Sequence, residues 1–345
     1  MQPRLMAIET AVPPFVLEQE DVAKRVEILF GGHKDIQRMM PIFENSGIKR
    51  RYSCVPIEWY SLPHGWKERT NLYIEHAVSI LEKVTLALLD SAKIRRDEID
   101  AIVTVSTTGV ATPSLDALLI ERLGLRRDTR RLPIFGLGCA GGVIGLARAA
   151  DMAKAMPGSR VLFLVVELCA LTFRKDDFSK SNIVATALFG DGAAGALIST
   201  DCEGPALGAS GEYTWTNSLD VMGWDVEDDG FRAIFSTSIP ILVGKDMRGI
   251  ADGFLHRLDL SRADIDLYAS HPGGAKVLTA LESAFELDDG ALTDSRATLR
   301  DYGNMSASTA MFVLARMDWR KAHQRIMMSS MGPGFTAAFQ LLGER

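Results

Sequence analysis

The stretch Gly138-Cys139-Ala140-Gly141-Gly142, followed by apolar positions across 143–148, decides the fold of this chain. It joins a possible nucleophile to small residues that leave backbone space beside it, and a helix-like apolar pattern follows directly. A cysteine between glycines is, taken alone, more often a tight turn or a small buried residue than a nucleophile. Its meaning therefore depends on what recurs elsewhere in the sequence.

A related pattern recurs later in the chain at a constant offset. Gly303-Asn304 precedes a helix-like segment at 311–316, and the offset from Cys139 to Asn304 is 304 − 139 = 165. Arg160 and Arg325 each precede a short apolar run, again with 325 − 160 = 165. Several segments at one spacing predict two homologous halves in which Cys139 and Asn304 hold equivalent positions.

The boundary between the halves is predicted at Asp201-Cys202-Glu203-Gly204-Pro205, a polar stretch rich in turn-forming residues. The expected division is 1–203, which carries the cysteine, and 204–345, which carries His271 and Asn304. Acidic turns before the apolar runs 101–105 and 267–270 match across the division with an offset of 166 at Ile99 and Ile265.

Helical and strand patterns alternate along the first half. Helical spacing covers 77–92 and 115–123, and continuous apolar runs typical of buried strands cover the following segments: 101–105, 132–135, 161–166 and 193–198. The alternation predicts a layered α/β fold with helices packed against two mixed sheets.

Composition limits the class of protein. Hydrophobic residues make up 47% of 345 and charged residues 24%, as in ordinary globular proteins with a sizeable core. A net charge of −6 disfavours broad nucleic-acid binding. No uncharged apolar run reaches the length of a membrane span, and the N-terminus lacks a signal-peptide pattern. Four scattered cysteines form neither a disulfide framework nor a metal motif, so we expect a cytoplasmic protein without a bound metal.

Three residues form the predicted reactive group. Cys139, at the first turn of a helix, is expected to have its pKa lowered by the helix dipole and by a nearby imidazole. His271 is that imidazole, because among the six histidines it alone ends a buried-type strand in a glycine-rich loop. The Asn304 amide can donate to a developing oxyanion. A cysteine protease uses similar parts, but no protease signature surrounds Cys139.

The chain resembles the thiolase-fold condensing enzymes, and among them the type III polyketide synthases of the chalcone synthase-like kind. The resemblance spans nearly the whole chain through ordered motifs: 48–52 (IKRRY), the Cys139 segment, 172–174 (TFR), 187–193 (ALFGDGA), 271–274 (HPGG), 302–306 (YGNMS) and 332–334 (GPG). It implies a thiolase-like fold of two pseudo-duplicated halves in an αβαβα arrangement.

The resemblance also implies roles for individual residues. Cys139 matches the nucleophile that carries the acyl chain, while His271 and Asn304 match the pair that stabilises the enolate formed when malonyl-CoA loses CO₂. Phe189 matches an aromatic gatekeeper between the CoA tunnel and the initiation chamber. The loop Gly332, Pro333 and Gly334 matches a wall of the active site.

Other positions bear on cavity size. Thr172 and Ser306 match small polar cavity residues. The second gatekeeper, aromatic in plant relatives, is predicted at Ile241, and a methionine that reaches into the partner's cavity is predicted at Thr112. Both replacements suggest a wider cavity. We therefore expect a long or bulky starter, a fatty acyl-CoA, and an alkylpyrone or alkylresorcinol product.

Substrate and partner expectations follow from the same resemblance. The substrates are malonyl-CoA and an acyl-CoA starter, with no further cofactor, and the protein is expected to be a homodimer. Arg38, Lys49 and Arg50 are the candidate CoA contacts, although an expected lysine is replaced by Asn45.

Alternative activities on the same fold remain open from the sequence. A ketoacyl carrier-protein synthase III that starts fatty-acid synthesis shares the Cys, His, Asn order, but it has a Gln-Ala-Asn-like stretch where this chain has Pro272-Gly273-Gly274. A degradative thiolase needs a second cysteine where this chain has Met331. Membrane-anchored elongases need an anchor, for which this sequence has no pattern. A non-catalytic relative is expected to lose the trio, which this chain keeps.

Overall fold

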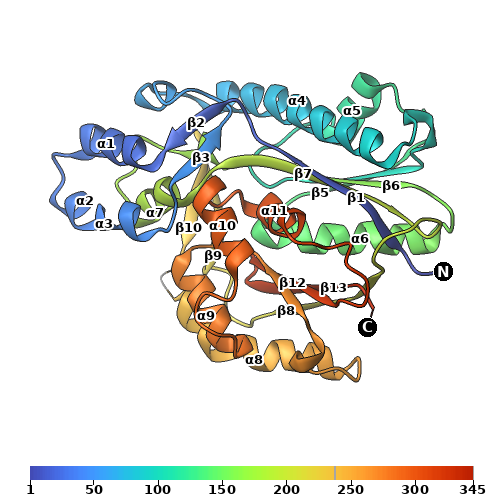
Figure 1. The fold of residues 1–345 in the computed structure, drawn as a ribbon. Helices are drawn as coiled ribbons and strands as arrows, with labels where there is room; N and C mark the ends of the chain where they lie inside the picture. The colour runs from blue at the N-terminus through green and yellow to red at the C-terminus, as the bar shows by residue number, and fades with distance from the viewer. Residues whose placement is uncertain (237, 345) are drawn as a thin grey trace.

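The computed structural model describes residues 1–236 and 238–344, and its two main sheets lie between three layers of helices (Figure 1). The strands of the first part of the chain are β1 (Arg4–Ala11), β2 (Phe15–Glu18), β3 (Arg50–Ser53), β4 (Ala101–Val105), β5 (Arg130–Ile134), β6 (Val161–Leu168) and β7 (Asp191–Ser199). Its helices are α1 (Gln19–Phe30), α2 (Lys34–Met39), α3 (Pro41–Asn45), α4 (Trp66–Ala92), α5 (Leu115–Leu123), α6 (Gly141–Ala155) and α7 (Lys180–Leu188).

The second part of the chain repeats this pattern with fewer strands. Its strands are β8 (Leu207–Thr214), β9 (Met222–Glu227), β10 (Gly230–Phe235), β11 (Leu267–Ser270), β12 (Ile326–Gly332) and β13 (Thr336–Leu342). Its helices are α8 (Ile239–His256), α9 (Ala275–Phe285), α10 (Thr293–Tyr302) and α11 (Thr309–Arg316).

The first sheet has the strand order β1-β7-β6-β4-β5 and the second has the order β11-β12-β13-β8. In the first sheet β4 runs parallel to β5 and β6, whereas β7 is antiparallel to β1 and β6. In the second, β11 runs parallel to β12, and β13 is antiparallel to its neighbours. Both sheets are mixed, as the alternation of patterns predicted.

Three hydrophobic clusters fill the space between the layers. One packs α4 and α5 on the outer face of the first sheet, and another packs α8 and α9 beneath the second. The middle cluster holds α6 and α11 between the two sheets (Figure 1). Strand β6 is buried along its whole length because helices cover both faces of its sheet, which explains its unbroken apolar sequence.

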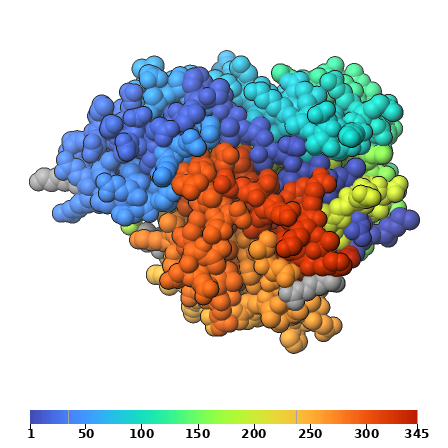
Figure 2. All heavy atoms as spheres, in the orientation of Figure 1, coloured from blue at the N-terminus to red at the C-terminus, as the bar shows by residue number. Residues whose placement is uncertain are grey.

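The chain passes from the first sheet to the second between Ser199 and Leu207, and the predicted boundary at 203/204 lies in this connection. The two parts form one continuous body, in which the blue N-terminal segment borders the orange and red C-terminal helices (Figure 2). Within the described residues no helix is both long and apolar enough to cross a membrane.

Candidate active site

Cys139 lies in a short 3-10 helix, Gly138–Ala140, immediately before α6. Gly138 has φ +47°, and a Cβ at that position would lie 2.4 Å from the Pro333 ring, so glycine is required for both conformation and space. The Cys139 side chain is 5% exposed, and its Sγ lies 3.6 Å from the Ser306 Oγ. The loop with Gly332 and Pro333 therefore packs directly against the nucleophile segment.

Asn304 follows α10, and its backbone joins the end of α7. Its N–H donates to the Leu188 carbonyl at 2.8 Å, and its carbonyl accepts from the Gly190 N–H at 3.0 Å. The Asn304 Oδ1 accepts from the Ser306 N–H at 2.9 Å, and its Nδ2 donates to the Gly273 carbonyl at 3.3 Å. These bonds fix the amide so that its NH₂ group faces the loop after His271.

His271 follows the last residue of β11 and is 3% exposed. Its backbone N–H donates to the Ser329 carbonyl at 2.8 Å, which anchors it to β12. Neither ring nitrogen has a hydrogen-bond partner among the described residues. Burial lowers the pKa of the imidazole to about 3, so the ring is neutral in the empty cavity.

The three predicted residues line one cavity of about 490 Å³. Its walls are mainly apolar, and elements on several sides contribute to them: α3, α7, β9, β10 and β12. The apolar residues include Ile42, Val184, Leu188, Met222, Phe235 and Met331. The structure therefore brings Cys139 together with His271 and Asn304, which follow it by more than a hundred residues.

The pKa of Cys139 differs from the sequence expectation. Burial raises the pKa of its thiol to about 12, with the buried Glu167 adding to the effect and the Ser306 hydroxyl opposing it. The helix dipole and imidazole were expected to lower this pKa, but desolvation dominates in the closed cavity. In the absence of substrate, burial thus favours a neutral thiol beside a neutral imidazole.

Of the two predicted gate residues, Phe189 lies beside another aromatic ring and Ile241 lies on the surface. Phe189 follows the last residue of α7, and its ring centre lies 5.4 Å from that of Phe235, a cavity residue, in an edge-on arrangement. Ile241, predicted as the second gate position, is 71% exposed on α8 and does not line the cavity. The prediction that Ile241 lines the cavity is therefore wrong.

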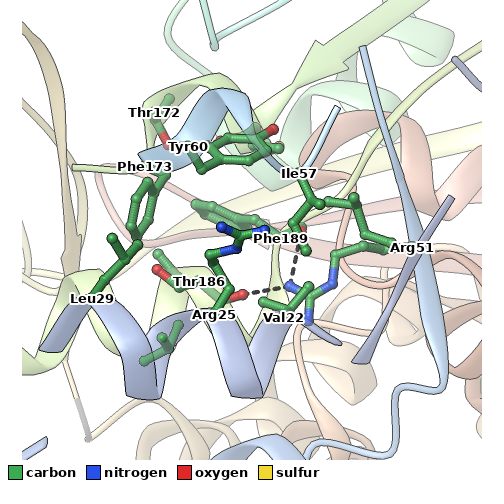
Figure 3. Close-up of a pocket in the computed structure, with 15 residues that line it drawn as sticks. Val22, Arg25, Leu29, Arg51, Ile57, Tyr60, Thr172, Phe173, Thr186 and Phe189 are labelled. Carbon is green, nitrogen blue, oxygen red and sulfur yellow. Dashed lines mark hydrogen bonds between the residues drawn. The ribbon is translucent and has the colours of Figure 1, made fainter. Parts of the chain in front are cut away.

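Other predicted cavity residues divide into buried and exposed positions. Thr172 and Ser306 are 9% and 5% exposed. Thr172 lines a smaller pocket of about 50 Å³ together with Phe189 (Figure 3). Thr112 is exposed and does not line the cavity of its own chain.

The predicted CoA contacts lie in two places. Arg38 lines the cavity, whereas Lys49 and Arg50 are exposed and do not line it, and their role as CoA contacts stays a prediction. Sequence reasoning missed Lys180 and Lys276, both exposed residues that line the same cavity. Lys276 could have been predicted at the cavity, because it lies five residues after His271, at the start of α9.

The part of the chain that the structure describes contains no group of three or more His, Cys, Asp or Glu residues placed to hold a metal ion. The arrangement instead offers a buried thiol, a neutral base and an oriented amide donor in one apolar cavity. These are the parts required to form a thioester and to stabilise an oxyanion.

Comparison with known proteins assigns the family. Residues 2–202 match the model of the N-terminal domain of chalcone and stilbene synthases, and residues 215–341 match that of the C-terminal domain. A putative chalcone synthase of Bacillus subtilis is 36% identical, with 98% of this chain and 97% of that protein aligned. A 1,3,6,8-tetrahydroxynaphthalene synthase of Streptomyces peucetius is 34% identical over 97% of this chain and 92% of its own length.

Solved structures agree with the family models. The crystal structure of 1,3,6,8-tetrahydroxynaphthalene synthase from Streptomyces coelicolor, a bacterial type III polyketide synthase, superposes with a TM-score of 0.95 at 29% identity and covers 99% of both chains. Its fold is thus the fold of this chain. The protein belongs to the chalcone and stilbene synthase family and is a type III polyketide synthase, a decarboxylating condensing acyltransferase of thiolase-like fold.

Proposed function

We propose that this synthase loads a fatty acyl-CoA starter on Cys139, extends it with malonyl-CoA over repeated rounds, and releases an alkylpyrone or alkylresorcinol. The observation that carries the proposal is the shared cavity of Cys139, His271 and Asn304, with its mainly apolar walls. The thioester substrates supply all the chemistry, and no further cofactor is required.

In the loading step the Cys139 sulfur attacks the thioester carbonyl of the starter while its proton passes to the neutral His271 ring, so that the thiolate does not form before the starter is bound. The CoA thiolate leaves and takes the proton back, which restores the neutral imidazole. Because Cys139 is buried among mainly apolar walls, we expect the acyl thioester to be shielded from hydrolysis while it waits for the extender.

In the extension step malonyl-CoA loses CO₂, and the electron pair of the broken bond becomes an enolate. Asn304 Nδ2 and the His271 N–H donate to the enolate oxygen. The hydrogen bond from the Ser306 N–H to Asn304 Oδ1 helps to orient the amide for this role. The enolate carbon then attacks the acyl group on Cys139, which frees the cysteine and leaves a chain longer by one ketide unit on CoA.

The cavity entrance supports binding of the CoA phosphates. Arg38, Lys180 and Lys276 place three cationic side chains on one cavity. We propose that they attract the phosphates of CoA, so Lys276→Ala should raise KM for malonyl-CoA and leave kcat unchanged. A loss of kcat without a change in KM would argue against this role.

A second copy of the chain is proposed to cover the edge of the first sheet. Strand β5 is the outer strand of that sheet, and nearby Phe135 and Val110 are 57% and 46% exposed. Thr112 lies in the same exposed region, from which it would reach the partner's cavity. Light scattering should show a dimer, and Phe135→Asp should weaken it; a fully active monomer would contradict this proposal.

A second product class has its own support. The paired rings Phe189 and Phe235 favour a small starter, and relatives named as 1,3,6,8-tetrahydroxynaphthalene synthases align over almost the whole chain. On this view malonyl-CoA serves as both starter and extender, and the product is a polyhydroxylated aromatic.

One experiment separates the two product classes. Purified enzyme is given malonyl-CoA alone, and then malonyl-CoA with starters from acetyl-CoA to palmitoyl-CoA, and products are identified by mass. Alkylpyrones or alkylresorcinols that form most rapidly with long starters support the first proposal. An aromatic product from malonyl-CoA alone, unaffected by added starter, supports the second.

A further inference from the structure

Arg51 is an unusual buried charge in this molecule. It lies on β3 and is 2% exposed, and no salt bridge to a carboxylate is found for it among the described residues. Its Nη1 donates to the Phe189 carbonyl at 3.1 Å and to the Thr186 carbonyl, whereas its Nε and Nη2 have no partner among the described residues (Figure 3). Burial lowers the pKa of its guanidinium to about 9.

A buried charge of this kind costs free energy, and an apolar side chain of similar size often replaces a buried ion without loss of stability. Fold stability alone therefore does not account for arginine at this position. Its two hydrogen bonds are both made to α7 or its end, the segment that carries the gate residue Phe189.

The stem of Arg51 also lies where the two parts of the chain meet. A Cβ at Gly190 would be 3.1 Å from the Arg51 Cβ and 2.5 Å from the Tyr302 carbonyl. At the same place Phe189 and Asn304 are paired in an isolated parallel bridge. Arg51 thus contacts the junction at which the gate and the amide donor are held side by side.

The neighbours of Arg51 along the chain reach both sides of this junction. The Lys49 N–H donates to the Arg300 carbonyl in α10 at 2.8 Å. The Tyr52 ring stacks on Tyr302 with 5.7 Å between ring centres. The Cys54 N–H donates to Asp191 at 2.9 Å, just beyond Phe189. Residues 49–54 form a strap across the junction, and Arg51 is its buried centre.

We infer that Arg51 is a positioning residue that fixes the gate ring of Phe189 and, through the bridge, the amide of Asn304. This inference rests on the proposed function, in which Asn304 donates to the malonyl enolate. Loss of Arg51 should then impair decarboxylation while starter transfer to Cys139 continues, because loading does not use the Asn304 amide. It should also loosen the choice of starter, because the gate ring becomes mobile.

The test compares Arg51→Met and Arg51→Lys with the wild type. The matched control is Arg96→Met, since Arg96 likewise donates to a backbone carbonyl, that of Leu123 at 3.1 Å, but lies away from the cavity. Three quantities are measured on the whole protein: malonyl-CoA decarboxylation without starter, the rate of acyl adduct formation on Cys139, and the melting temperature.

Arg51→Met should lower kcat for decarboxylation between about tenfold and a hundredfold, the cost of misplacing a catalytic group, with KM and adduct formation unchanged. Arg51→Lys should recover part of that loss, because an ammonium can still donate to one carbonyl, and Arg96→Met should match the wild type. If Arg51→Met does not fold, Arg51→Lys decides by the same split between decarboxylation and loading.

Unchanged decarboxylation in Arg51→Lys and Arg51→Met would overturn the inference and leave the proposed function intact. An equal fall in decarboxylation and loading, accompanied by a lower melting temperature, would reduce Arg51 to a structural role and also overturn it. A wild-type enzyme that does not decarboxylate malonyl-CoA would overturn the proposed function itself.

Discussion

The segment that carries Cys139 and the segment that carries Asn304 are equivalent in position and different in chemistry. Each leads through a short 3-10 helix into a helix of the middle layer, α6 after Cys139 and α11 after Asn304. The first presents a thiol to the cavity, and the second presents an amide whose oxygen is held by the Ser306 N–H. The two segments thus reach one cavity, and in the proposed function each serves a different step of the reaction.

The close approach of the two segments is itself built from small residues. A Cβ at Gly142, in the first turn of α6, would lie 2.1 Å from the Ala307 carbonyl. Because no side chain separates them, the Cys139 Sγ and the Ser306 Oγ come within 3.6 Å. A larger residue at Gly142 or at Ala307 would therefore separate the thiol from the amide donor.

The largest expected effect concerns the thiol alone. Cys139→Ala should abolish acyl loading, because no other nucleophile replaces the thiol in the proposed reaction. Mass spectrometry of the wild type incubated with acyl-CoA should find the adduct on the peptide that contains Cys139. Cys202→Ala is the matched control and should load normally. An adduct on Cys54, Cys169 or Cys202 would contradict the assignment of loading to the segment that carries Cys139.

A smaller effect is expected at the gate between the segments. Phe235→Ala should shift the preferred starter towards larger acyl groups, because it removes an aromatic ring from the cavity wall. Ile241→Ala should leave the preference unchanged, since that side chain lies on the surface. The starter preference of each variant is measured as the ratio of kcat/KM values across a series of starters. A larger shift from Ile241→Ala than from Phe235→Ala would restore the sequence-based assignment.

The smallest effect concerns stability behind the nucleophile. Burial raises the pKa of Glu167 to about 7, so its protonated form is favoured on folding. The stability that this group contributes is present below its unfolded pKa of about 4.3 and is lost as the pH rises through about 7. The glutamine in Glu167→Gln does not titrate. As the pH is raised from about 5 to about 8, the melting temperature of the wild type minus that of Glu167→Gln should therefore decrease. A difference that rises with pH would show that Glu167 is stabilised as a carboxylate.

The sequence predicted the fold well because its evidence was local or repeated. The helix expected over 115–123 and the strand expected over 101–105 have those bounds in the structure, and the offset of 165 anticipated the related positions of Cys139 and Asn304. Apolar periodicity reports burial directly, and a repeat reports equivalent positions in space. The three residues of the predicted reactive group also line one cavity.

The failures arose where local sequence does not fix the surroundings of a side chain. The ring beside Phe189 belongs to Phe235, at the end of β10, whereas alignment with the resembling family through Lys245-Asp246 led to Ile241, which is exposed on α8. The Cys139 pKa depends on burial by distant segments, which no neighbouring residue reveals. Lys180 was missed because its proximity to the cavity comes only from the packing of α7.

The central claim is that the first segment loads the starter and the second generates the enolate. Its most direct test is Asn304→Ala, assayed both for the acyl adduct on Cys139 and for CO₂ release from malonyl-CoA, with His271→Ala as the variant expected to lose both. The account predicts a normal adduct and a decarboxylation rate lower by a factor of about 10² to 10³, the usual effect of removing one oxyanion donor. An equal loss of loading and decarboxylation in Asn304→Ala would contradict it.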